Sequence, residues 1–120
     1  MSPGHSSNAD ILQALQRLKA QAAHLVRRGR PAFLAEDLDG DLNRLAGEGL
    51  IIALQSALED LPEGFIEQHS DLPFRLVRGM RNRLAHGYDD VDAGLLWSTM
   101  QHRLREFIDA VIDRLDPGDS

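Results

Sequence analysis

The chain has 120 residues, a net charge of −6 and no cysteine. This length suits one small domain, and the absence of cysteine excludes disulfides and thiolate metal sites. The negative charge argues against nucleic-acid binding by the whole surface. The start of the chain lacks the basic and apolar segments of a signal peptide, and the longest apolar run, 50–54, is too short to span a membrane. We therefore expect a cytoplasmic protein with no membrane segment.

Both ends of the chain are rich in residues that disfavour regular structure. Residues 1–8 and 116–120 contain Ser, Gly, Pro and Asp, so we expect two disordered tails around a domain at 9–115. A first helix is predicted to begin at a cap on Asn8 or Asp10 and to end near Gly29. Apolar residues follow its 3.6-residue spacing, and they are Ile11, Leu15, Leu18, Ala22 and Leu25.

A turn at 32–36 is predicted to lead into a second long helix, from about Leu38 to Leu61. Three glycines weaken this helix, so we expect a kink or a late start near Gly49. Its predicted inner stripe is Leu38, Leu42, Leu45, Ile52, Leu58 and Leu61. Pro62 then opens a short helix at 63–69.

A third major helix is predicted to begin at Asp71 or Pro73 and to end at Gly87. Asp92 caps a last helix that reaches Leu115, with a stripe of Leu96, Met100, Leu104, Phe107, Val111 and Leu115. These patterns predict an all-α bundle of four main helices plus short ones. Four apolar residues fall off the stripes and indicate self-association, unless other parts of the same chain cover them; they are Ile51, Leu95, Trp97 and Ile108.

Basic residues gather in one segment of this acidic chain. Residues 72–88 contain four arginines and no acid, whereas acidic residues lie on both sides. The pattern suits one anionic ligand held at one place, or else pairing of the arginines with the neighbouring acids. Because the guanidinium group matches phosphate oxygens, the candidate phosphate-binding residues are Arg75, Arg78 and Arg83, together with Arg81.

The same segment contains a histidine at the predicted end of the helix. His86 shares one helix face with Arg78 and Asn82, and Arg81 lies roughly 140° away by helical arithmetic. Cleavage of RNA without a metal needs a base for the 2′-hydroxyl proton and cations for the phosphorane. Imidazole suits the first role and arginine the second. Alternatively, His86 does no chemistry and only stabilises the helix end.

The other possible ligand residues do not form a metal site. The remaining histidines are isolated from one another, and the acidic run around Gly40 lacks the spacing of a calcium loop. We therefore expect no metal and no cofactor.

The segment from Leu72 to Tyr88 resembles the HepT-like family of HEPN-fold proteins. That family commonly reads Gly-Met-Arg-Asn, three variable residues, His, one residue and Tyr, and residues 79–88 match at every fixed position. The Leu61-Pro62 junction and the order of helices fit as well, so the resemblance covers about 9–115.

The resemblance implies an all-α, up-and-down homodimer with the motif lining a cleft between subunits. It implies a metal-independent endoribonuclease toxin, with Arg81 and His86 catalytic and Asn82 supporting them. It also implies a partner, an MntA-like minimal nucleotidyltransferase antitoxin, which transfers AMP from ATP onto the motif tyrosine, here Tyr88. Added phosphates beside His86 would occupy the cationic pocket in place of RNA.

The chain departs from the family pattern in the second long helix. Many members carry Gly-Glu-Ala just before the Leu-Pro, and this chain reads Gln55-Ser56-Ala57 there. The missing carboxylate bears on how the motif arginine is oriented. It motivates an alternative function, an inactive HEPN dimer that acts as the binding or substrate partner of a nucleotidyltransferase.

Overall fold

The computed structural model describes residues 7–85 and 92–116, and every regular element in these ranges is helical. The prediction of an all-α fold is therefore confirmed. The elements in chain order are α1 (Asn8–Arg27), α2 (Arg30–Leu34), α3 (Leu38–Glu59), α4 (Phe65–Gln68), α5 (Phe74–Ala85), α6 (Ala93–Thr99), the π-helical segment η1 (Met100–Leu104) and α7 (Arg105–Leu115).

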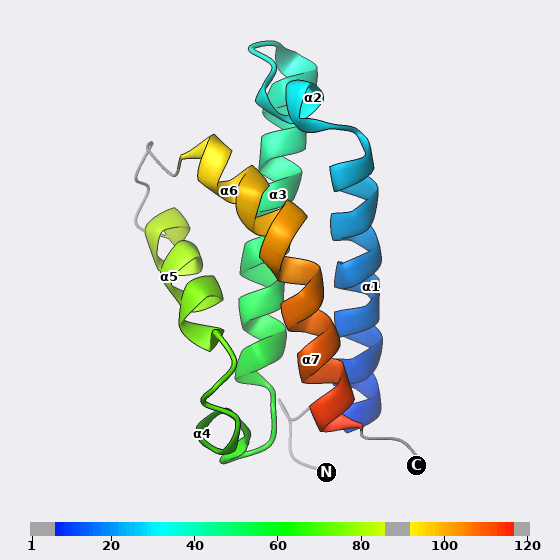
Figure 1. Cartoon of the computed structure of the whole chain (residues 1–120), viewed down its shortest axis with the longest axis vertical. Helices are drawn as coiled ribbons and strands as arrows, with labels where there is room; N and C mark the ends of the chain where they lie inside the picture. The colour runs from blue at the N-terminus through cyan, green and yellow to red at the C-terminus, as the bar shows by residue number, and fades with distance from the viewer. Residues whose placement is uncertain (1–6, 86–91, 117–120) are drawn as a thin grey trace.

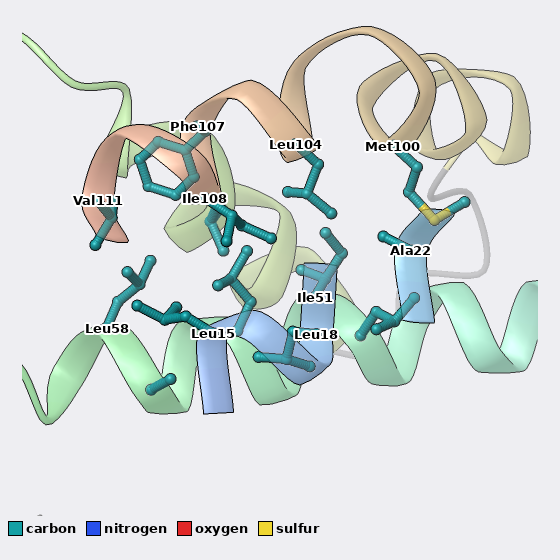
Figure 2. Close-up of a cluster of buried hydrophobic side chains, with 14 of the residues drawn as sticks. Leu15, Leu18, Ala22, Ile51, Leu58, Met100, Leu104, Phe107, Ile108 and Val111 are labelled. Atoms are coloured by element: carbon teal, nitrogen blue, oxygen red, sulfur yellow. The ribbon is translucent and has the colours of Figure 1, made fainter. Parts of the chain in front are cut away.

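The long helix α3 lies between α1 and α5, and the continuous helical path α6–η1–α7 crosses in front of it (Figure 1). The core fills the space between these layers. Figure 2 shows Leu15, Leu18 and Ala22 of α1 meeting Ile51 and Leu58 of α3. Side chains from the last helical path close the same cluster, and those labelled are Met100, Leu104, Phe107, Ile108 and Val111.

The first helix follows its predicted pattern. All five residues of the predicted stripe are buried. The cap differs, because the hydroxyl oxygen of Ser7 accepts the hydrogen bond from the Asp10 amide at 3.1 Å. The turn predicted at 32–36 is largely the short helix α2. Gly29 supplies a backbone φ of 93°, which favours glycine, and Pro31 occupies the first turn of α2.

The predicted inner stripe of α3 is wrong for four of its six residues. Leu38, Leu42, Leu45 and Ile52 are 80, 65, 66 and 48% exposed, and only Leu58 and Leu61 of the stripe are buried. The apolar residues that α3 buries are Leu50, Ile51, Leu54, Ala57 and Leu58.

Glycines explain which face of α3 turns inward. A Cβ at Gly40 would lie 1.9 Å from the carbonyl oxygen of Ala35, and one at Gly47 would lie 3.1 Å from the Phe33 ring. These two glycines therefore mark the side on which α2 and its following loop pack closely. The helix runs without interruption from Leu38 to Glu59, so the predicted late start near Gly49 is wrong.

The last predicted helix contains a wide turn that the sequence pattern did not indicate. Asp92 caps it as predicted, accepting from the Gly94 amide at 2.8 Å. The π-helical segment η1 then inserts between α6 and α7. A π turn shifts the register of a helix face, so residues on both sides of the predicted stripe reach the core.

Three of the four off-stripe residues are covered within the chain. Trp97, Ile108 and Ile51 are buried, and the Trp97 ring packs 5.5 Å from that of Phe33. Only Leu95 is exposed. The apolar surface that remains open therefore lies mainly on α3, where it was not expected. In the described ranges, no helix has both the length and the hydropathy required to cross a membrane.

Candidate functional site

Helix α5 carries the described part of the motif, and it presents one apolar and one open face. Phe74, Val77 and Met80 are buried, and the Phe74 ring meets that of Phe107 edge-on at 5.4 Å. A Cβ at Gly79 would meet no described atom within 4 Å. The open face therefore consists of backbone at this glycine and of exposed polar side chains, namely Arg75, Arg78 and Asn82.

The segment that leads into α5 is held by the C-terminal turn of α7. The guanidinium of Arg114 donates to both carboxylate oxygens of Asp71, at 2.6 and 2.7 Å. A further contact at 3.4 Å joins Arg114 to Nδ1 of His69. The hydrogen bonds from Arg114 hold the pKa of the Asp71 carboxyl below its usual value. The start of the motif helix is thus fixed by charge as well as by the buried Phe74.

Within the described residues, no acid pairs with an arginine of α5. Salt bridges among residues 7–85 and 92–116 join Lys19 to Asp109, Arg44 to Asp41 and Arg114 to Asp71, and none involves an arginine of α5. The acid nearest in sequence before the helix, Asp71, is occupied by Arg114. The alternative in which the preceding acids neutralise this segment is therefore not supported within these ranges.

Arg81 differs from its neighbours because it is only partly exposed. Its Nη1 donates to Oδ1 of Asn82 at 3.3 Å, so two of the three predicted catalytic residues are in contact. Arg83 is exposed near the end of α5. The predicted base His86 and the predicted modification site Tyr88 lie outside the described residues, so their geometry relative to Arg81 remains a prediction.

The two residues that depart from the family pattern, Gln55 and Ser56, differ in exposure: Gln55 is buried and Ser56 is exposed. Gln55 is 7% exposed, and its Nε2 donates to Oε2 of Glu59 at 3.4 Å. Its Oε1 is buried without a hydrogen-bond partner among the described residues. Ser56, which stands where many family members carry glutamate, is exposed on the outer side of α3.

Sequence reasoning missed a second basic feature, a groove of about 550 Å³ between α1 and α3. Its basic rim consists of Arg17 and His24 on α1 and Arg28 at the C-cap of that helix, and its floor is aliphatic. A signal was available, because residues 11–35 contain five Lys and Arg and no acid. The residues that form the floor are Leu18, Leu25, Ala46, Gly49, Leu50 and Ala53.

One end of this groove is built by hydrogen bonds. Arg28 Nη1 donates to Oδ1 of the buried Asn43 at 2.8 Å, and Asn43 Nδ2 donates to the carbonyl oxygen of Ala32 at 3.1 Å.

In the part of the chain that the structure describes, no three His, Asp or Glu side chains gather as a metal site would require.

Comparison with known proteins identifies the family. Residues 35–113 match the model of the family described as "Ribonuclease HepT-like". A relative in Caldanaerobacter subterraneus subsp. tengcongensis, named "Putative RNase", is 36% identical over 50 residues, which is 42% of this chain and 45% of the relative. A "Probable ribonuclease HepT" of Thermococcus cleftensis is 36% identical over 45 residues, 38% of this chain and 41% of the relative.

The matched segments cover less than half the length of each of these relatives. No solved structure gives a significant match. The family model, in contrast, spans most of the chain, including α3, α5 and the helical path from α6 into α7. The chain therefore belongs to the ribonuclease HepT-like family.

Proposed function

We propose that the chain is a metal-independent endoribonuclease that acts in the cytoplasm as the toxin of a toxin–antitoxin pair. The observation that carries the proposal is the open face of α5 in a member of this family. Arg75 and Arg78 project there without an ion pair among the described residues, next to the accessible backbone of Gly79. Such a surface suits the phosphates of a single RNA strand.

The proposed chemistry divides between the motif residues. The imidazole of His86 takes the proton from the 2′-hydroxyl, whose oxygen then attacks the adjacent phosphorus. The P–O5′ bond breaks, which leaves a 2′,3′-cyclic phosphate on one fragment, and the departing 5′-oxygen takes up a proton from the imidazolium or from water. Arg81 stabilises the charge that develops on the phosphorane oxygens. The contact between Arg81 and Asn82 supports a role for Asn82 in holding the guanidinium. We place Arg75, Arg78 and Arg83 on the flanking phosphates.

The proposed active form is a homodimer, and its proposed regulator is an MntA-like nucleotidyltransferase. That partner would transfer AMP from ATP to the hydroxyl of Tyr88 and release pyrophosphate. Since Tyr88 lies two residues after His86, the added phosphate would sit near the cations that bind RNA and would compete with it. Intact mass after incubation with an active partner and ATP tests this step. If the tryptic peptide that contains Tyr88 stayed unmodified during the whole incubation, the proposed transfer would be contradicted.

Cleavage of RNA in the presence of EDTA is the decisive experiment for the activity. We expect wild-type protein to cut RNA under these conditions, and His86→Ala and Arg81→Ala to lose the activity. Arg105→Ala, at an exposed arginine on α7, is the matched control and should cut like wild type. Equal cleavage by all four proteins would indicate a contaminating nuclease and exclude the catalytic assignment.

A second candidate function is favoured by the residues at the departure from the family pattern. With Gln55-Ser56 in place of Gly-Glu, the carboxylate that could orient the motif arginine is missing. In this alternative, the chain is an inactive HEPN dimer that binds a nucleotidyltransferase and serves as its substrate. Modification of Tyr88 without any EDTA-resistant cleavage would select this function, and restoration of cleavage by Ser56→Glu would identify the cause.

A further inference from the structure

The outer face of α3 carries a line of large aliphatic side chains that nothing in the described chain covers. We call this line the α3 ridge, and it consists of Leu38, Leu42, Leu45 and Ile52. The residues follow one another at intervals of four, three and seven, so they lie on one side of the helix. The layer of α6, η1 and α7 packs on the other side (Figure 1). Contiguous apolar surface of this kind marks an interaction site.

The groove between α1 and α3 runs beside this ridge. On the α3 side, the small residues Ala46, Gly49 and Ala53 line the groove together with the buried Leu50. A Cβ at Gly49 would meet no described atom within 4 Å, so the helix backbone is accessible there. A shallow trough between two helices, lined by aliphatic and small side chains, can receive the apolar edge of another helix.

The charges on the two sides of this surface are opposite. The groove is edged by Arg17 and His24 of α1 and by Arg28 at the C-cap of that helix. On the far side of the ridge, Glu48 and Glu59 lie roughly 40–60° around α3 from Leu45 by helical arithmetic. The ridge is thus an apolar line with an acidic flank, and the groove is an apolar trough with a basic rim.

We propose that the α3 ridge of one copy packs into the α1–α3 groove of a second copy, and that the contact is reciprocal. The chain itself carries both complementary halves, which is the requirement for an isologous interface. A twofold axis running along α3 turns the acidic flank of one copy toward the basic rim of the other. Helix α5 packs against α3 on the side away from α1, so the ridge lies between the groove and α5.

This inference rests on the homodimer of the proposed function and not on RNA cleavage. It is tested with the full-length chain by sedimentation equilibrium, over concentrations that cover the monomer–dimer transition. We expect the ridge variant Leu42→Asn/Leu45→Asn and the groove variant Ala53→Glu each to weaken dimerisation at least tenfold. All three residues are exposed, so circular dichroism should show an unchanged fold.

Leu95→Asn is the matched control, because Leu95 is an exposed leucine that lies on α6 and not on the ridge. It should dimerise like wild type. A wild-type chain that stays monomeric at every concentration would exclude both this interface and the homodimer. Unchanged dimerisation of the ridge and groove variants would exclude this interface alone.

A cross-link gives a second test, since the chain has no cysteine of its own. A tagged Leu45→Cys chain mixed with an untagged Gln21→Cys chain should form a mixed disulfide on mild oxidation, because Gln21 lines the groove. Replacing the first chain by tagged Leu95→Cys should abolish the mixed product. Equal yields from the two mixtures would contradict the proposed contact.

Discussion

Arg114 donates a hydrogen bond to each carboxylate oxygen of Asp71. Arg114 is the next-to-last residue of α7, and Asp71 lies three residues before α5. The pairing joins positions 43 residues apart in sequence and fixes the segment that leads into the motif helix. Because these hydrogen bonds favour the charged carboxylate, the pKa of Asp71 is lower in the folded chain than its ordinary value of 3.8.

The lowered pKa predicts how the stabilisation by Asp71 depends on pH. Above about pH 5 the carboxylate is charged in both the folded and the unfolded chain, and its contact with Arg114 contributes its full stabilisation. As the pH falls, the carboxyl is protonated in the unfolded chain before it is protonated in the folded chain. The stabilisation therefore decreases with falling pH and is lost once the pH passes below the pKa of the folded state. We expect Asp71→Asn to lower the Tm at pH 6, and the difference from wild type to shrink as the pH falls from about 5 toward 2.

The control for this prediction is Asp113→Asn. Asp113 is an exposed acid beside Arg114 with no salt bridge among the described residues. Its replacement should leave the Tm within about a degree of wild type, as expected for an exposed residue outside a specific contact. A Tm difference for Asp71→Asn that stays constant from pH 6 to pH 2 would show that the charge of Asp71 is not the cause.

The buried amide of Gln55 gives a second prediction. Its Oε1 lacks a hydrogen-bond partner among the described residues, and its donor bond to Glu59 is long at 3.4 Å. Replacing a buried unpaired polar group by an apolar one of similar size removes a desolvation cost of about 1–3 kcal/mol. Gln55→Leu is therefore expected to leave the free energy of unfolding unchanged or to raise it, measured by urea denaturation.

Gln55→Ala separates the polar effect from packing. It also removes the unpaired oxygen, but it leaves a cavity between α3 and its neighbours, so we expect it to be about 2–5 kcal/mol less stable than Gln55→Leu. If Leu proved much less stable than Gln, the amide would have to make a hydrogen bond in solution that the structure does not contain.

Helices α1 and α3 differ in how well the sequence pattern predicted their buried faces. In α1 the apolar residues occur at one helical spacing only, so they identified the buried face. In α3 leucines lie on the outside while Ile51, Leu54 and Leu58 lie inside, so periodicity alone could not choose between two apolar faces. The choice is made by Gly40 and Gly47, whose missing side chains allow close packing of the residues around α2. These contacts depend on how α2 packs against α3, which the spacing of apolar residues along α3 does not reveal.

Those glycines provide a third prediction. Gly40→Ala would place a Cβ 1.9 Å from the backbone oxygen of Ala35, which cannot move as a flexible side chain could. We expect a loss of stability of about 1–3 kcal/mol or more, as for overpacking in a core. Gly79→Ala is the matched substitution at an open helical position. It should stabilise the chain by up to about 1 kcal/mol through helix propensity. Equal effects of the two substitutions on urea denaturation would contradict the close contact at Gly40.

For the candidate site, sequence and structure contributed different parts. The acid-free run of arginines pointed to an anion site, and the structure shows that Arg75 and Arg78 share an open face. The α1–α3 groove was missed because its residues come from two helices, and its small floor residues carry no chemical signal. The partial burial of Arg81 and its contact with Asn82 likewise depend on how α5 packs, which helical arithmetic on one helix does not describe.

The last prediction concerns how RNA meets the open face of α5. Each arginine that contacts a phosphate contributes about 0.7 to the slope of log affinity against log salt concentration for a single strand. We expect Arg78→Ala to weaken binding of a labelled RNA oligonucleotide and to reduce this slope by about that amount, as measured by fluorescence anisotropy at several salt concentrations in the His86→Ala background to prevent cleavage. Arg105→Ala, which removes the same charge from α7, should leave the slope unchanged. A smaller slope in both variants would mean that RNA responds to net charge and not to the face formed by Arg75, Arg78 and Asn82.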